Sequence, residues 1–541
     1  MRTGVSDMRG NSGNFDNTGR LVRFMLKREA IISSVWIIII ILFTTAIAPG
    51  MSSMFDKEAR LQFVSSMDNP VMIAMMGPVY GLSAMTPAIV LAQNCLIWFA
   101  IAVIVMNIFF VNRYTRVDEE LGRLEMIIAL PVGRLTDGVA MIFLSFVLNI
   151  VVALLIALFT LATNIEGASI GGALVYGLSI GMQGFLFAML TLLMAQLFST
   201  AGASMGASFA FMGIFYMLRA YGDMNENVFS YISPMGLGLK VEAFYANHLF
   251  PITILFVQAL VAAVLALWVN ARRDSGSGVF PAQKGEAHAG RFLQTPIGFA
   301  WRLLRGGFFA WAIGIFALGA SYGSVIGEID SFVESNDAIR QILEGHGGAA
   351  TLADAYIAML ACMTALIVSI PVINCINRLR TEEQRGRLES IIATSVSRKT
   401  IFGSFIAIAT FEAIALTFFG ALGLYVAASS SGLIAFETLM KAVFVYLPAL
   451  FIMLAIAVFL VGRLPKLTSW VWLLFGYSFL MFYFGRLFNV SEIMLKISPF
   501  GNIPQLPVEE LSILPLFIMC VIAVVFCAVG IVGFKKRDVK N

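Results

Sequence analysis

The amino-acid sequence predicts an all-α polytopic membrane protein, with twelve transmembrane helices arranged as two parallel six-helix repeats. Three observations lead to this fold class: the composition, the number of long apolar runs, and a charged segment that occurs twice. Hydrophobic residues make up 59% of the 541 positions, charged residues make up only 13%, and the mean hydropathy is +0.88. A soluble domain carries about 25% charged residues, so lipid must cover most of these helices.

Twelve apolar runs are long enough to cross a bilayer, which takes about 20 helical residues. In the first half they start near Ile31, Thr86, Gly138, Gly171, Ala201 and Pro251, and in the second half near Phe308, Ala355, Ile401, Met440, Ser469 and Leu511. The first run, residues 31–48, follows a long basic segment and is followed by Pro49, which does not fit a cleaved signal peptide. We therefore expect this run to be retained as the first helix.

The basic residues predict the orientation of the chain. If the amino terminus is cytoplasmic, 28 of the 36 Lys and Arg residues lie in segments on the same side. These segments are the two termini and the loops around residues 113–134, 272–305, 378–399 and 463–466. Because Lys and Arg near short loops are retained in the cytoplasm, both termini are predicted to be cytoplasmic.

A charged segment occurs twice. Residues 116–136 and 380–400 are identical at twelve of 21 aligned positions, with an offset of 264 residues. Arg273-Asp274 and Arg537-Asp538, which follow the last span of each half, have the same offset. Because each half contains an even number of spans, both halves enter the membrane in the same direction, which predicts parallel repeats.

Each predicted half contains one charged loop. The first half covers residues 1–273 with its loop at 113–137, and the second covers residues 291–541 with its loop at 378–400. The stretch at 274–290 is rich in Gly, Ser and Ala and is expected to be a flexible cytoplasmic linker. Basic amphipathic stretches at 19–28 and 292–304 precede the first span of each half, and we expect them to lie in the membrane plane.

The repeated segment is a candidate docking surface for another protein. On a helix, Leu124, Ile127 and Ile128 form one apolar face. Glu119, Arg123 and Glu125 carry charge around that face, an arrangement that fits a groove on another protein. The alternative is a helix that rests on the lipid headgroups and dips its Leu and Ile side chains into lipid. Two acidic residues in each copy argue against that alternative.

The repeated loops, the amphipathic stretches, the segment from Asn69-Pro70 to Tyr80-Gly81 and the Arg-Asp endings resemble permeases of the type 2 ABC exporter family. Within that family the chain is most similar to the double-length, twelve-helix subgroup associated with resistance to polyketide antibiotics such as tetronasin. The resemblance implies that the helix after the second span of each half is a coupling helix that fits a cleft on an ATPase. The implied ATPase-coupling residues are Glu119, Gly122, Arg123, Leu124, Glu125, Glu383, Gly386, Arg387, Leu388 and Glu389.

The resemblance also implies a function. It is that of a permease subunit of an ATP-driven exporter, which moves amphiphilic, antibiotic-like or lipid-like compounds out of a bacterial cell through its plasma membrane. The chain holds no Gly-x-x-x-x-Gly-Lys-Ser/Thr motif, so ATP and Mg²⁺ are expected on a separate subunit and no catalytic site in this chain. Two loops imply two ATPase copies per chain, and no nucleic acid is expected as a partner. The alternative is an ion-coupled secondary transporter with Glu412 as its proton site.

Three ionisable side chains are candidates for the substrate path. Glu412 lies in the middle of the ninth span, where it either lines the path, binds a proton, or is neutral and hydrogen-bonded to a neighbouring helix. Arg219 and Arg486 end the fifth and eleventh spans, where they either frame an exit vestibule or extend to the headgroups.

A methionine-rich segment at 68–81 is the last candidate for the path. Pro70, Gly77 and Pro78 bound an apolar piece that is too short to span the membrane. We expect a re-entrant or interfacial helix on the outer side, in which Met72, Met75 and Met76 either contact varied apolar cargo or merely rest on the headgroups. The scattered His residues and the five Cys residues, which all lie in apolar spans, are not at metal-ligand spacing, so no metal site is expected.

Overall fold

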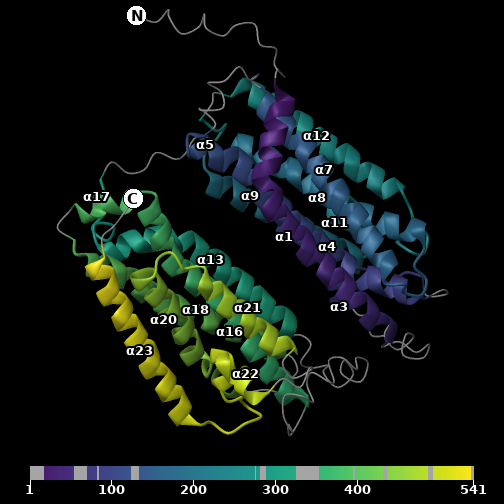
Figure 1. Cartoon of the computed structure of the whole chain (residues 1–541). Helices are drawn as coiled ribbons and strands as arrows, with labels where there is room; N and C mark the ends of the chain where they lie inside the picture. Colours follow the sequence, from purple (N-terminus) through teal and green to yellow (C-terminus); the bar gives the residue numbers. More distant parts are fainter. Residues whose placement is uncertain are drawn as a thin grey trace, which may run out of the picture. The chain divides into compact units, whose positions relative to one another are not determined.

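The computed structural model describes residues 17–53, 70–81, 85–123, 133, 135–273, 276–280, 288–323, 352–393, 396–429, 435–484 and 491–537. Within these ranges the chain is helical, and its β pairing is limited to an isolated bridge between Phe198 and Phe280. The chain divides into two compact units, Met1–Gly285 and Glu286–Asn541 (Figure 1). The boundary lies inside the stretch at 274–290 that the sequence predicts to be a linker.

Each unit consists of helices that follow one another along the chain. Unit 1 contains α1 (Thr18–Ser53), α3 (Pro70–Met76), α4 (Pro87–Asn112), the π-helix η2 (Arg113–Val117), α5 (Asp118–Glu120), α7 (Thr136–Ala162), α8 (Ile170–Leu197), α9 (Ala201–Met224), α10 (Phe229–Ile232), α11 (Pro234–Leu239) and α12 (Phe250–Arg272). Unit 2 contains α13 (Pro296–Gly323), α16 (Leu352–Gln384), α17 (Arg387–Ile392), α18 (Arg398–Ala428), α19 (Phe436–Phe444), α20 (Leu447–Arg463), α21 (Trp470–Phe484), α22 (Glu492–Ile497), the 3₁₀-helix η5 (Pro499–Asn502) and α23 (Ile513–Lys536).

The helices confirm a polytopic, all-α membrane protein. Among the described residues, 11 helices are long and apolar enough to cross a membrane, and α19 and α20 together form one of them. The span that the sequence places near Ser469 corresponds to α21, which has 15 residues and is shorter than a full crossing. The predicted number of twelve full-length spans is therefore not reached within the described ranges.

Both units pair their helices in a similar order. In unit 1, α8 packs against α4, α7 and α12, and α1 packs against α7. In unit 2, α20 packs against α16, α18 and α23, and α13 packs against α18; Figure 1 shows α23 running beside α20. Helices with the same place in the two halves of the sequence therefore have the same neighbours.

Small residues allow close contact between α13 and α18. A methyl group on Gly319 would lie 2.6 Å from the carbonyl oxygen of Gly420, and one on Gly323 would lie 2.3 Å from that of Leu424. The two backbones therefore touch directly, as in membrane helices that associate through glycines one turn apart. In lipid, where apolar surface gives no drive for helices to associate, such close packing supplies the dispersion energy.

Buried amides join helices in unit 1, a common way for polar side chains to link membrane-spanning helices. Asn107 of α4 and Asn149 of α7 exchange two hydrogen bonds, at 2.9 and 2.8 Å, and both side chains are fully buried. Each amide also donates to a carbonyl one turn earlier in its own helix, namely Val103 and Ser145. Their hydrogen-bonding groups are thus used within the protein.

The basic stretches before each half differ from the expectation of separate in-plane helices. The first is continuous with its span, because α1 runs for 36 residues from Thr18. No Pro or Gly separates Arg28 from Ile31, so nothing interrupts the backbone hydrogen bonds there. In unit 2 the helix starts only at Pro296, a residue favoured in the first turn, and then continues into the span.

Candidate functional site

A buried glutamate in the loop after α4 is held between two arginines of unit 1. Glu119 forms ion pairs with Arg116 and with Arg273, each at 2.7 Å, and accepts a hydrogen bond from the backbone N–H of Gly276. Its side chain is only 6% exposed. We call Arg116, Glu119 and Arg273 the first ion cluster. It ties the charged loop to the end of α12, the last span of its unit.

The same arrangement occurs in unit 2. Glu383 forms ion pairs with Arg380 at 2.8 Å and with Arg537 at 2.6 Å, and its side chain is 1% exposed. Arg380, Glu383 and Arg537 form the second ion cluster, and each lies 264 positions after its counterpart in the first. This cluster joins the end of α16 to the end of α23.

A second pair of charges and a glycine turn also recur at this offset. Arg123 pairs with Asp118 at 3.0 Å, and Arg387 pairs with Glu382 at 3.4 Å. Between them, Gly122 and Gly386 both have a φ of 69°. A side chain would strain this left-handed conformation, although the space around both glycines is open. The backbone therefore reverses at matching points in the two loops.

The short helix α17 follows Gly386 and presents a charged face. Arg387 and Glu389 are exposed, whereas Leu388 is 1% exposed and belongs to the apolar core of unit 2, with Ile391 and Ile392 packed against it. We expected the apolar face of the repeated segment to bind a partner protein. In unit 2 its apolar side chains instead pack on their own unit, which removes them from water. Leu124 and Glu125 lie outside the described residues, as do Ile127 and Ile128.

The first loop also contacts two other helices of unit 1. Arg28 of α1 pairs with Asp118, and the carboxylate of Glu120 accepts a hydrogen bond of 2.6 Å from the N–H of Ala201, the first residue of α9. In unit 2, Arg398 at the start of α18 donates to the backbone carbonyl of Arg537. A displacement of either loop would therefore be transmitted to more than one span.

At the other end of α4, Arg219 holds the methionine-rich helix α3. Its guanidinium is fully buried and donates to the carbonyl oxygens of Ile73, Ala74 and Met75 in the last turn of that helix. Asp223 pairs with Arg219 at 3.4 Å. The structure thus brings Arg219 and the methionine segment together, and the side chain does not extend to the surface.

The methionine segment packs against α9 and α4 of its own unit. The side chains of Met75 and Met76 are half-buried, and the hydroxyl of Tyr216 donates to the carbonyl oxygen of Met75. Met72 lies in α3, but its side chain is outside the described residues, and so is Arg486.

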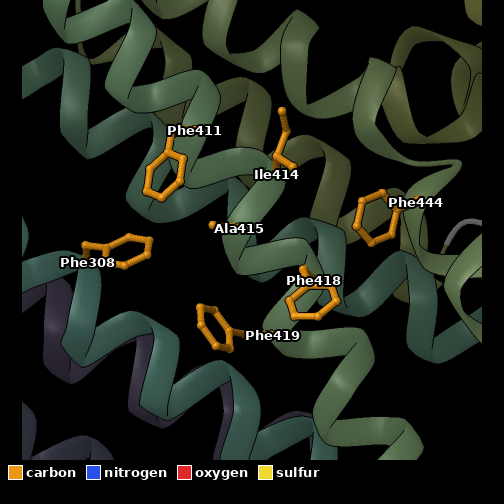
Figure 2. Close-up of a pocket in the computed structure, with 7 residues that line it drawn as sticks. All are labelled: Phe308, Phe411, Ile414, Ala415, Phe418, Phe419 and Phe444. Carbon is orange, nitrogen blue, oxygen red and sulfur yellow. The ribbon is translucent and has the colours of Figure 1, made fainter.

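An apolar pocket of about 500 Å³ lies beside α18 in unit 2. Phe411, Ile414, Ala415 and Phe418 recur along one face of that helix, and Figure 2 shows them facing the pocket together with Phe308, Phe419 and Phe444. Glu412 is 3% exposed and lies on the other face, among buried residues such as Ile408 and Leu416. The sequence candidate Glu412 therefore does not line this pocket.

Comparison with known proteins gives the family. A family profile described as the C-terminal domain of the multidrug efflux system permease Rv1217c matches residues 293–535. The chain is also 30% identical to the multidrug efflux system permease protein Rv1217c of Mycobacterium tuberculosis, over 97% of this chain and 96% of the relative. The chain belongs to the multidrug efflux permease family. The similarity to the relative extends over both units.

Sequence reasoning missed several residues of this multidrug efflux permease. It selected Glu119 and Glu383 as partner contacts, but it did not connect them with Arg273 and Arg537, which lie 154 residues later in each case. The signal was present, because Arg273 and Arg537 repeat with the same offset of 264 residues as Glu119 and Glu383. Asp223 gave no such signal, because its partner Arg219 was expected either to frame an exit vestibule or to extend to the headgroups.

Proposed function

We propose that this permease is the transmembrane subunit of an ATP-driven exporter of the type 2 ABC class, which moves amphiphilic drug-like compounds outward. The observation that carries the proposal is the pair of ion clusters at matching positions of the two charged loops. A pair of ATPase subunits needs two equivalent docking surfaces on the permease, each firmly joined to the transmembrane helices. An ion-coupled secondary transporter does not require docking surfaces for an ATPase. Its candidate proton site, Glu412, does not line the apolar pocket.

The loop residues take different roles in this proposal. The exposed Arg387 and Glu389, with Arg123 and Glu125 in the first loop, contact the ATPase. Glu119 and Glu383 are buried and do not contact the ATPase; they fix each loop to the last span of its unit. Gly122 and Gly386 set the reversal of the backbone, and Leu388 anchors α17 to unit 2.

The partner supplies the energy. ATP and Mg²⁺ bind to a separate ATPase, of which two copies dock on one permease chain with both termini in the cytoplasm of a bacterial cell. Cargo leaves through the plasma membrane, and the phenylalanine-lined pocket of about 500 Å³ is of a size and character that suit polyketide-like and other large apolar compounds. In unit 1, the methionine-bearing helix α3, which Arg219 holds in place, belongs to the outer end of the path.

Charge reversal on the loops tests the proposal. Glu389→Lys and Glu125→Lys should reduce co-purification of the ATPase and ATP-dependent export, while the amount of permease in the membrane stays at the wild-type level. Glu510→Lys, which reverses an exposed carboxylate between α22 and α23, is the matched control and should leave both unchanged. Wild-type ATPase association in a variant that carries both loop reversals would refute the proposal.

A further inference from the structure

A second, more enclosed pocket lies in unit 1, between α4 and the segments that follow α3 and α11. Its volume is about 170 Å³, and its lining combines apolar with polar side chains, among them Met76, Leu96, Leu239, Gln93, Lys240 and Glu242. A cavity of about 150 Å³ in a protein interior accommodates benzene. The pocket therefore has room for one aromatic ring or a short alkyl group.

The walls of this pocket are fixed by contacts within unit 1. Arg219 holds the end of α3, directly before the wall residues Met76 and Pro78. The amide of Gln93 donates to the carbonyl oxygen of Pro78, and the hydroxyl of Tyr80 donates to that of Ala243. The cavity is thus formed before a ligand arrives, which reduces the ordering that binding requires.

The wall after α11 adopts an unusual backbone conformation. Glu242, Phe244 and Asn247 have φ values of 46°, 64° and 53°, in the left-handed region that non-glycine residues rarely occupy. The carbonyl oxygen of Glu242 accepts hydrogen bonds from three N–H groups in the following residues, and the Asn247 side chain accepts one from the N–H of Phe244. Backbone strain of this kind accumulates at ligand sites, where surrounding contacts maintain it.

The charges around the pocket favour a cationic ligand. The ammonium of Lys240 lies 5.3 Å from the ring centre of Tyr231, which is not part of the lining. The carboxylate of Glu242 has a looser contact, at 3.9 Å from the imidazole of His248. Both Glu242 and Tyr80 line the pocket, and burial, followed by the negative charge of Glu242, raises the pKa of the Tyr80 phenol.

We infer that this pocket binds an organic cation that carries one aromatic ring or short alkyl group, with its positive charge at Glu242 and against the ring of Tyr80. A carboxylate and an aromatic ring face each attract a positive charge, so a pocket lined by both suits an ammonium group. The inference names a class of cargo beyond the proposed function. Only the role of the pocket as an export subsite depends on that function, because binding to the isolated permease needs neither ATP nor an ATPase.

Direct binding to the purified full-length permease in lipid nanodiscs tests the inference. The probe is benzyltrimethylammonium, and benzyl alcohol and benzoate serve as neutral and anionic probes of similar size. Wild-type protein should bind the cation saturably and more tightly than either matched probe. Glu242→Gln should weaken cation binding by about tenfold, as expected when a charged hydrogen-bonding or ionic partner is lost.

Two further variants locate the site and control for general effects. Met76→Trp should abolish binding by filling the pocket, and Lys240→Gln should strengthen cation binding by removing a like charge. Glu226→Gln, which neutralises an exposed carboxylate elsewhere in unit 1, should leave the affinity unchanged. Equal affinity for benzyl alcohol, tighter binding of benzoate, or unchanged cation binding in Glu242→Gln would overturn the inference. Cation binding without ATP-dependent export would instead count against the proposed function alone.

Discussion

Buried arginines perform the main structural tasks at the scale of single residues. Arg116 is 1% exposed and Arg219 is fully buried, so each must exchange its hydration for partners inside the protein. Arg116 neutralises a carboxylate, whereas Arg219 satisfies the carbonyl oxygens at the end of a helix as well as Asp223. In both cases the charge joins segments that lie far apart in the sequence.

Removal of the carboxylate from the second ion cluster should destabilise unit 2. Glu383→Ala leaves Arg380 and Arg537 close together without the negative charge between them. Breaking a buried ion pair in this way costs on the order of 3 kcal/mol, so the thermal unfolding temperature in detergent should fall by several degrees. Glu389→Ala removes an exposed carboxylate from the same segment and should leave that temperature unchanged. Wild-type unfolding of Glu383→Ala would show that the cluster is dispensable for stability.

Neutralisation of Glu412 should leave export largely intact. Gln keeps the shape and hydrogen-bonding capacity of the side chain but cannot ionise, and position 412 faces the interior of unit 2, away from the apolar pocket. Phe411→Ala, on the pocket face one residue earlier, is the informative comparison and should lower export of large apolar compounds. The measurement is accumulation of a fluorescent substrate in cells. Near-complete loss of export in a well-folded Glu412→Gln variant would restore the proton-coupled alternative.

At the scale of elements, the sequence located α3 but not its partner. Pro70 and Gly77 bound the apolar piece, and the helix in the structure runs from Pro70 to Met76. The residue that holds it, Arg219, is about 145 positions further along the chain, a relation that no local pattern contains. The sequence pattern likewise predicted the apolar face of the repeated segment. Whether this face packs on its own unit or on a partner depends on the tertiary structure, which the pattern does not contain.

Loss of the Arg219 side chain should release α3. In Arg219→Ala the carbonyl oxygens of Ile73, Ala74 and Met75 lose a charged donor, so residues 70–77 should exchange amide hydrogens faster by about one order of magnitude. Tyr216→Phe removes a single hydrogen bond to Met75 and should have a smaller effect. Hydrogen exchange followed by mass spectrometry measures both. Equal exchange in wild type and Arg219→Ala would mean that packing alone holds the helix.

At the scale of the whole molecule, the sequence predicted the fold class correctly, because composition and apolar runs determine that the helices lie in lipid. The repeat offset aligns Glu119 with Glu383 and Arg273 with Arg537 in the sequence. In the structure, Glu119 pairs with Arg273 in unit 1, and Glu383 pairs with Arg537 in unit 2. The predicted twelve full-length spans are not reached among the described residues, because α21 combines an apolar sequence with only 15 helical residues. Hydropathy indicates whether a segment is surrounded by lipid or by water. The length of its helix also depends on where the backbone hydrogen bonds of the helix end.

The two braced loops predict the composition of the complete transporter. Each loop is fixed within its own unit by its own ion cluster, so each should present a complete docking surface. Native mass spectrometry of the co-purified complex should therefore find two ATPase copies for one permease chain. Glu389→Lys should reduce the number to one, because the first loop is unaltered, and the combination with Glu125→Lys should reduce it to zero. A complex with one ATPase for each wild-type permease chain would mean that only one of the loops docks, despite their matching geometry.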